Sequence, residues 1–176
     1  MKIRRATPDD AATLALLGHR TFEETFGPAN DPANMALFLE KTYGEEQQRR
    51  ELEQPDFITL LCEEDGVAIA FAQLLPVPTP SEQNAIEIVR FYVDRPWHGR
   101  GIAQTLMEEA KRIARELAAA AVWLVVWEHN PRAIAFYEKC GFRDEGWVPF
   151  ILGNDVQTDR VMVARLEEEV SRGDPS

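Results

Sequence analysis

The residues best suited to chemistry lie in one loop, residues 98–104, between a β-branched apolar run and a long amphipathic pattern. Gly99 and Gly101 let the backbone bend there and approach a ligand closely. The first N–H groups of a helix lack internal partners and carry partial positive charge, which favours bound phosphate. We therefore expect this loop to hold the pyrophosphate of a cofactor.

Two familiar phosphate-binding loops do not fit the spacing. A dinucleotide-binding fingerprint needs a third Gly or Ala where Gln104 stands, and a P-loop must end in Gly-Lys-Ser/Thr. A Gly-x-Gly pair by itself also fits an ordinary turn before a helix. The wider pattern must decide between the two interpretations.

The elements that position this loop follow from periodicity and capping. Helices are expected from Thr7-Pro8 to about residue 25, from Asp31-Pro32 to about residue 43, over 102–117 and from Asn130-Pro131 to Gly141. Strands are expected at 2–5, 57–63, 67–75, 85–93, 121–127, 143–151 and 157–166. Residues 45–53 read as a polar, exposed helical turn or two. This order predicts a mixed α/β sheet with helices on both faces.

Composition limits the class of protein. The chain has 176 residues, 45% of them apolar and 28% charged, with a net charge of −11. The negative charge argues against nucleic acid as a partner and weakly favours a cationic one. No apolar run is long enough for a membrane span, the N-terminus shows no signal peptide, and Cys62 and Cys140 have no metal or disulfide spacing. We expect one cytoplasmic domain over 1–166 and a charged tail over 167–176.

A second motif makes the pattern specific. After the 121–127 strand comes Asn130-x-x-Ala133-x-x-Phe136-Tyr137-x-x-x-Gly141-Phe142. Together with the strand, Gly-x-Gly loop and helix before it, this resembles the GCN5-related N-acetyltransferase (GNAT) superfamily. The resemblance implies an α/β fold: a mixed, mostly antiparallel twisted central sheet of about seven strands. Its two central parallel strands, 86–93 and 122–127, would splay to hold acetyl-CoA, with no metal.

The resemblance also implies roles for individual residues. The pantetheine arm would lie along the first central strand, the pyrophosphate on the loop, and the second motif beside the arm. The implied cofactor-binding residues are Phe91, Tyr92, Val93, His98, Gly99, Arg100, Gly101, Ile102, Ala103, Gln104, Asn130, Ala133, Phe136 and Tyr137. His98 stands where the family usually has Gln or Arg, so we expect its backbone to matter more than its side chain. Arg100, Arg132 and Lys139 could reach phosphates or remain solvated.

Catalysis is expected to need an acid and a base. The Tyr137 hydroxyl would protonate the departing thiolate, unless Tyr137 is simply a core aromatic. Glu87, at the head of the central strand, would deprotonate the amine, unless it is an exposed strand-end carboxylate. Strand alternation predicts that Glu87, Val89 and Phe91 share one face.

The acceptor is expected to be a small cationic amine. Residues 21–26, 30–39, 123–128 and 157–159 resemble a bacterial subgroup that includes spermidine/spermine N-acetyltransferases of the PaiA type. Glu23, Glu24 and Glu40 would grip a polycation, although they also fit a solvated helix face. A peptide α-amine or lysine, or a non-catalytic acyl-CoA-binding regulatory role, remains an alternative.

The oligomeric state stays open at this point. A homodimer could use the final strands or Trp123, Trp127 and Trp147, but a place in the core is the commoner role for tryptophan.

Overall fold

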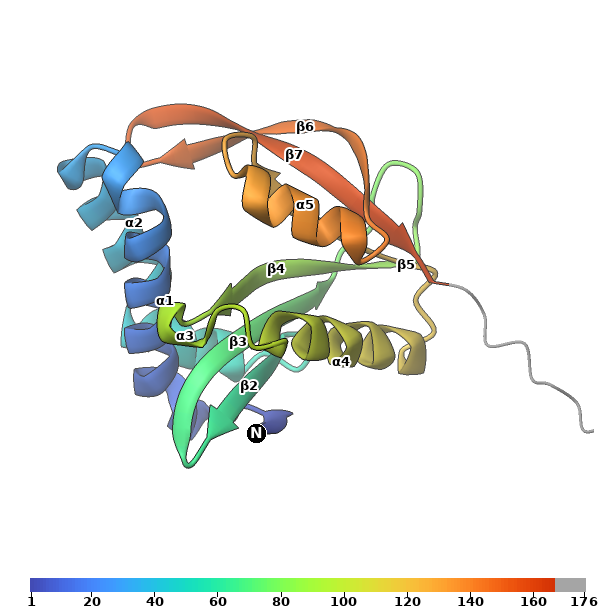
Figure 1. Cartoon of the computed structure of the whole chain (residues 1–176), viewed down its shortest axis with the longest axis horizontal. Coiled ribbons are helices and arrows are strands. Elements are labelled where there is room, and N and C mark those ends of the chain that lie inside the picture. The colour runs from blue at the N-terminus through green and yellow to red at the C-terminus, as the bar shows by residue number, and fades with distance from the viewer. Residues whose placement is uncertain (167–176) are drawn as a thin grey trace, which may run out of the picture.

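One seven-stranded sheet forms the centre of the computed structural model, which describes residues 1–166 (Figure 1). The strands lie in the order β1-β2-β3-β4-β5-β7-β6, and all neighbours are antiparallel except β4 and β5. The strands are β1 (Lys2–Arg5), β2 (Ile58–Glu64), β3 (Val67–Pro76), β4 (Ala85–Val93), β5 (Ala121–Trp127), β6 (Arg143–Leu152) and β7 (Asp155–Arg165). The predicted mixed, mostly antiparallel sheet is confirmed. The predicted tail lies outside the described residues.

Helices cover both faces of this sheet, as predicted. They are α1 (Ala11–Phe26), α2 (Pro32–Tyr43), α3 (Glu45–Leu52), α4 (Ile102–Glu116) and α5 (Pro131–Lys139), with short 3-10 turns at Pro8–Asp10, Gly27–Ala29 and Arg95–Trp97. One buried apolar cluster joins the sheet to α4 and α5, and a second lies under α1 and α2 (Figure 1). Within the described part of the chain, no helix combines the length and apolar character needed to cross a membrane.

The two central strands separate soon after they begin. β4 and β5 pair in parallel over three positions, the last of which joins Glu87 to Trp123. β4 then continues for six more residues and β5 for four without pairing to each other. The predicted splay is therefore present, and it leaves the β5-facing backbone edge of β4 free for a ligand.

A bulge in β4 overturns one prediction about its faces. Ile88 and Arg90 pair with consecutive residues of β3, so Val89 is an extra residue. Phe91 consequently packs in the same cluster as Ile88, on the side of α4 and α5. Glu87, which precedes Ile88, points to the opposite face. The expectation that Glu87 and Phe91 share a face is wrong, because alternation shifts by one residue at the bulge.

Helix α3 is also more buried than its polar sequence suggests. Gln48 is fully buried and Glu51 is 6% exposed. Glu51 accepts hydrogen bonds from Arg90 at 2.5 and 3.1 Å, and Gln73 accepts another from Arg90 at 2.5 Å. The predicted polar helical segment is present and most of residues 45–53 are exposed, but the expected exposure is wrong for Gln48 and Glu51. Glu51 is buried because it neutralises Arg90.

The tryptophans divide between the interior and the surface. Trp123 and Trp127 are half-buried, and the indole N–H of Trp123 donates to the carbonyl of Val77 at 2.8 Å. Trp147 on edge strand β6 is 63% exposed. The expectation of a core position is therefore wrong for Trp147.

Candidate functional site

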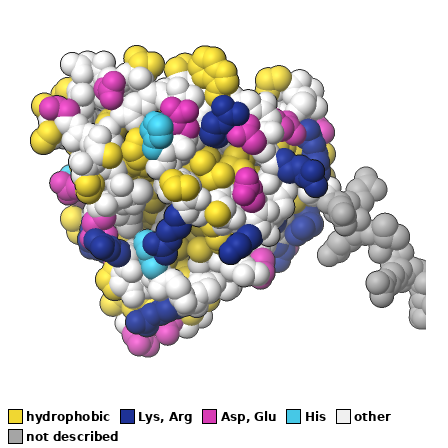
Figure 2. Space-filling view, turned by 45° about the horizontal axis from the view of Figure 1, so that its top comes forward, with side chains coloured by type: hydrophobic (Ala, Val, Ile, Leu, Met, Phe, Trp, Pro, Cys, Tyr) yellow, Lys and Arg dark blue, Asp and Glu magenta, His cyan; other side chains and the backbone are white. Residues whose placement is uncertain are grey.

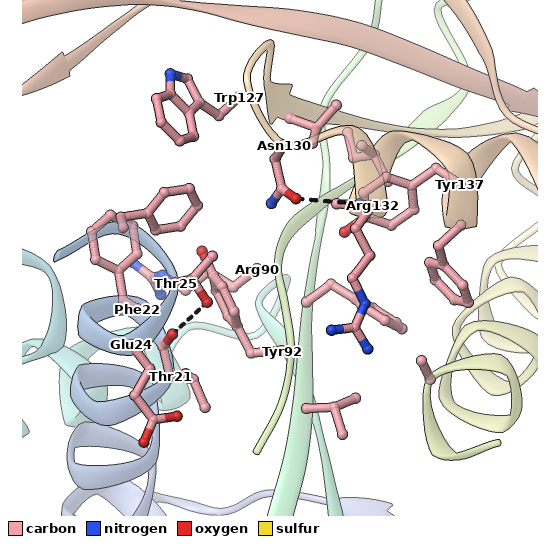
Figure 3. Close-up of a pocket in the computed structure, with 18 of the residues that line it drawn as sticks. Thr21, Phe22, Glu24, Thr25, Arg90, Tyr92, Trp127, Asn130, Arg132 and Tyr137 are labelled. Atoms are coloured by element: carbon pink, nitrogen blue, oxygen red, sulfur yellow. Dashed lines mark hydrogen bonds between the residues drawn. The ribbon is translucent and has the colours of Figure 1, made fainter. Parts of the chain in front are cut away.

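A cavity of about 1090 Å³ opens where β4 and β5 diverge. Residues from α1, α2, β4, the loop after β4, β5, α5, β6 and β7 line it. Figure 3 shows α1 on one side of this space and α5 on the other, with Arg90 and Tyr92 of β4 between them. The cavity therefore joins the predicted phosphate-binding loop to the predicted acceptor side.

The loop after β4 presents a row of free amides. Gly99 and Gly101 have φ values of +76° and +77°, and Gly101 is the N-cap residue of α4. Within residues 1–166, no hydrogen bond uses the N–H groups of residues 99–104. Left-handed φ favours glycine and turns successive amides outward, which makes a concave anion site at a helix N-terminus. This geometry fits a pyrophosphate.

His98 differs from its neighbours in this loop. Its N–H donates to the carbonyl of Arg95 at 3.1 Å, and its Nε2 lies 2.7 Å from the carbonyl oxygen of Val93. Both groups are used to tie the loop to the end of β4. The expectation that the backbone of His98 binds phosphate is therefore wrong for its N–H group, and the free amides begin at Gly99.

Basic side chains surround the donor side of the cavity. Arg95, Arg132 and Lys139 line it, and Figure 3 shows Arg132 of α5 extending into it. Arg100 is not among the lining residues; its guanidinium lies over the ring of Trp97, 4.8 Å from the centroid. Figure 2 shows Lys and Arg side chains around a hollow that exposes hydrophobic side chains. In a chain of net charge −11, this local positive charge suits an anionic ligand.

The second motif forms the start of α5 and one wall of the cavity. The side-chain oxygen of Asn130 accepts the N–H of Ala133 at 3.3 Å, which caps the helix and leaves the amide NH₂ of Asn130 available to a ligand (Figure 3). Asn130, Ala133 and Phe136 all line the cavity. Phe91 of β4 lies across from Phe136, with ring centroids 5.9 Å apart. The two predicted motifs therefore meet at one cavity.

Tyr137 lies in the same wall, among aromatic rings. It is 9% exposed, and its ring centroid lies 6.2 Å from that of Phe91 and 5.8 Å from that of Phe142. Burial raises the pKa of its hydroxyl above the usual range. No hydrogen bond within the described residues uses this hydroxyl, which borders the cavity. The group therefore keeps its proton at neutral pH and can donate it to a ligand.

Glu87 borders the cavity where the splay begins. Its side chain is half-buried, and burial raises the pKa of its carboxyl. No salt bridge within residues 1–166 involves it. A carboxylate without a cationic partner and with a raised pKa is a better base than an ordinary one.

The three acidic residues predicted to bind the acceptor are not gathered at one place. Glu24 of α1 lines the cavity, where it is exposed (Figure 3). Glu23 faces a separate shallow depression and lies 3.6 Å from His19. Glu40 is exposed and is not among the residues lining the cavity. The structure thus brings only Glu24, of these three, to the site.

Two groups at the site were missed as functional residues in the sequence. Arg90 lines the cavity and is held by Glu51 and Gln73, as described above. Asp159 of β7 lines it too, is 5% exposed, and pairs in register with Trp127. For Arg90, a charged residue within a mostly apolar strand was the available signal. Asp159 stands among polar neighbours in β7, so that strand gave no comparable signal. Among the described residues, no group of three or more His, Cys, Asp or Glu side chains could hold a metal ion.

Comparisons with known proteins agree with this geometry. Residues 21–142 match the model of the acetyltransferase (GNAT) family. An uncharacterized N-acetyltransferase from the pepI 3' region of Lactobacillus delbrueckii subsp. lactis is 33% identical over 94% of this chain and 98% of its own. The spermidine N(1)-acetyltransferase of Thermoplasma acidophilum is 23% identical over 82% of this chain and 89% of its own.

Solved structures share the fold. The PaiA N-acetyltransferase of Thermoplasma acidophilum, in complex with coenzyme A, superposes with a TM-score of 0.81 at 21% identity, covering 94% of this chain and 98% of that one. The ribosomal-protein-S18-alanine N-acetyltransferase of Escherichia coli gives 0.71 at 17% identity, with 97% of each chain covered. With the family match over most of the chain and the free amides beside the splayed strands, the protein belongs to the GNAT acetyltransferase family: it is an N-acetyltransferase, and acetyl-CoA is its acetyl donor.

Proposed function

We propose that this enzyme acetylates a primary amine of a small cationic acceptor, with polyamines as the first candidates, by direct attack of the amine on the thioester. The observation that carries this proposal is the continuity of the cavity. One end is bordered by the free amides of residues 99–104 and by basic side chains. The acidic residues Glu24, Glu87 and Asp159 line the same cavity. An anionic donor and a cationic acceptor would thus meet in one space.

The donor's position follows from the free backbone groups. The pyrophosphate would rest on the amides of Gly99 to Gln104, and the pantetheine arm would run along the unpaired edge of β4, at Phe91, Tyr92 and Val93. Asn130, Ala133 and Phe136 would flank the arm from α5. When bound, the donor supplies a thioester carbonyl, which this arrangement would bring close to Tyr137 and Glu87.

The proton transfers can then be assigned. Glu87 would take a proton from the acceptor's ammonium group, which leaves a neutral amine able to attack. The nitrogen–carbon bond would form, the carbon–sulfur bond would break, and the departing thiolate would take the proton of the Tyr137 hydroxyl. The acylated nitrogen would still carry one proton more than the amide, and water would carry this proton to the Tyr137 phenolate. Glu87 would then release its proton to solvent. A free backbone N–H of the splayed β4 edge would stabilise the oxyanion that develops on the carbonyl.

The closed acceptor side favours a small amine over a peptide. Asn30, just after α1, accepts a hydrogen bond from Gln157 of β7 at 2.5 Å. The Asn34 side chain of α2 accepts the N–H of Asn154 at 3.1 Å, and the rings of Phe38 and Phe150 lie 5.4 Å apart. These contacts join the first two helices to the last hairpin beside the cavity, which supports a small acceptor over an extended peptide.

Thiol release tests the proposal directly. The enzyme is mixed with acetyl-CoA and a panel of amines: a diamine, a triamine, a monoamine, an alanine-terminated peptide and a lysine-containing peptide. The rate of free CoA thiol formation is then measured. We expect the polyamines to give the highest kcat/KM. If either peptide gave a higher kcat/KM than the polyamines, the acceptor would be a peptide α-amine or a lysine and not a small amine.

A further inference from the structure

Asp159 is a buried carboxylate whose surroundings leave it unsatisfied. It is 5% exposed, and its Oδ1 is buried without a hydrogen-bond partner among the described residues. It nevertheless lines the large cavity. Burying an unpaired charge is costly, so such a group is expected to meet a cation or a donor from a ligand.

The cations near this end of the sheet are already used. Next to Asp159 on β7, Arg160 pairs with Asp144 at 2.7 Å, and His129, whose ring lies against Trp127, is 3.4 Å from Glu128. Within residues 1–166, no Lys, Arg or His side chain forms a salt bridge with Asp159. The protein's own cations therefore do not satisfy this carboxylate.

Aromatic side chains complete the surroundings expected for an alkylammonium group. Asp159 lies opposite Trp127 on the neighbouring strand, and directly opposed residues share one face of a sheet. The ring centroid of Trp127 lies 5.8 Å from that of Phe26, and both residues line the cavity. Aromatic faces attract organic cations and pack against alkyl chains.

The positions of Asp159 and Glu87 suggest an acceptor with two amino groups. Glu87 pairs with Trp123, and Asp159 pairs with Trp127, four residues further along the same strand. Paired residues share a face of the sheet, and residues four apart along a strand do too, so all four lie on one face. Asp159 is offset from Glu87 by four residues along β5 and lies on the other side of this strand. Two carboxylates on one face, separated along the cavity, match a molecule with an amino group at each end.

We propose that Asp159 binds the non-reacting ammonium group of an acceptor that carries at least two amino groups, and so determines specificity for diamines and polyamines. This inference rests on the proposed function, in which Glu87 serves the reacting amine. Asp159 acts on the far end of the substrate. Its loss should therefore weaken acceptor binding more than it slows the chemistry.

Kinetics of Asp159→Asn test the role. The substitution keeps the size of the side chain and removes its charge. With 1,4-diaminobutane as acceptor, we expect KM to rise about tenfold to hundredfold, with kcat and the KM for acetyl-CoA changed less than twofold. The preference for 1,4-diaminobutane over butan-1-amine, measured as the ratio of kcat/KM values, should fall by a similar factor.

A neighbouring carboxylate provides the matched control. Glu128 is not among the residues lining the cavity, and its charge acts on Asp159 from the same end of the sheet. Glu128→Gln should leave both KM values within twofold. If Glu128→Gln raised the KM for 1,4-diaminobutane as much as Asp159→Asn does, the effect would come from general negative charge, and the proposed contact of Asp159 with the ammonium group would be wrong. A fall in kcat for both amines at unchanged KM would make Asp159 a base and overturn the proposal.

Direct binding separates this inference from the proposed function. Calorimetric titration of 1,4-diaminobutane into the CoA-bound enzyme needs no turnover. Binding to the original protein that weakens tenfold or more in Asp159→Asn supports the inference, even if no amine is acetylated. Absence of binding to the original protein, or equal binding to both, overturns it.

Discussion

At the scale of single residues, one burial effect would serve both roles proposed for Tyr137 and Glu87. Burial raises the pKa of both groups, because the charged form of each is poorly solvated. For the phenol of Tyr137, the raised pKa keeps the proton on the hydroxyl until a stronger base is present. For the carboxylate of Glu87, the raised pKa means greater basicity. Burial beside one cavity thus favours a neutral acid and a strengthened base.

Removing the Tyr137 hydroxyl should slow the reaction without disturbing the fold. In Tyr137→Phe, we expect kcat at pH 7.5 to fall about a hundredfold, because the thiolate must leave without a positioned acid. The KM for acetyl-CoA should stay within twofold, since the ring and its contacts with Phe91 and Phe142 remain. Steady-state thiol release measures both. Full activity in this variant would remove the acid role from Tyr137.

The titration of Asp159 should make the free energy of unfolding depend on pH. Burial, followed by the nearby charge of Glu128, raises its pKa to about 6, from about 4 in an unfolded chain. The folded state then binds more protons than the unfolded state between these values, so this group's contribution to stability is present at low pH and is lost as pH rises from about 4 to about 6. The loss should amount to about 2 to 3 kcal/mol.

Urea unfolding at several pH values measures this effect. Asp159→Asn has no proton to lose there, so the difference in unfolding free energy between the variant and the original protein should shift in favour of the variant as pH rises from 4 to 7. Parallel curves over this range would show that the carboxyl titrates normally in the folded protein.

At the scale of elements, the sequence predicts best those features that are local. The helix starts at Asp31-Pro32 and Asn130-Pro131 depend on neighbouring residues and are found as predicted, and the strand bounds lie within two residues of the prediction. The β4 bulge depends on how β4 pairs with β3, so alternation alone placed Glu87 on the wrong face. The burial of α3 likewise depends on Arg90, some forty residues away. Local spacing shows neither the irregular pairing of β4 with β3 nor the contact of α3 with Arg90.

The loop after β4 allows a controlled test of an element. Gly101→Ala places a Cβ at φ +77°, where no atom lies within 4 Å, so the protein itself has room for it. We expect a loss of about 1 kcal/mol from backbone strain. We also expect the KM for acetyl-CoA to rise tenfold or more, because the methyl group would occupy the space that the diphosphate needs.

Gly66 provides the control for this substitution. It has φ +78° and equally open surroundings, but it lies in the β2–β3 turn and does not line the cavity. Gly66→Ala should lower the thermal midpoint about as much as Gly101→Ala and leave the KM for acetyl-CoA unchanged. Similar KM values in the two variants would mean that residue 101 does not approach the donor.

At the scale of the whole molecule, the proposed acceptor side of the cavity forms where distant parts of the chain meet. The segment after α1 and the start of α2 contact the β6–β7 hairpin more than a hundred residues later, through Asn30–Gln157 and Asn34–Asn154. No local pattern predicts such a meeting, and nothing in the helix sequences separates Glu24, which lines the cavity, from Glu23 and Glu40, which do not. All the implied cofactor-binding residues except Arg100 line the cavity, because two contiguous motifs supply them.

Substitution at the tip of that hairpin should affect the acceptor side alone. A Cβ on Gly153 would lie 2.4 Å from Oδ1 and 2.7 Å from Cα of Asn34, at φ +63°. Backbone atoms of α2 cannot yield as a flexible side chain would, so Gly153→Ala should move the hairpin away from α2. We expect the KM for 1,4-diaminobutane to rise fivefold or more and the KM for acetyl-CoA to stay within twofold, because the loop and α5 do not touch this contact.

The partner residue shows whether the docked hairpin, rather than a general loss of stability, sets acceptor affinity. Asn34→Ala removes the hydrogen bond to Asn154 and leaves the hairpin free of any clash. It should raise the KM for the diamine less than Gly153→Ala does. In Gly153→Ala, hydrogen exchange should quicken in residues 150–157 and remain slow in β4. If exchange instead quickened throughout the sheet, the acceptor effect would reflect loosening of the whole fold, and the closed wall would lose its role in selecting small amines.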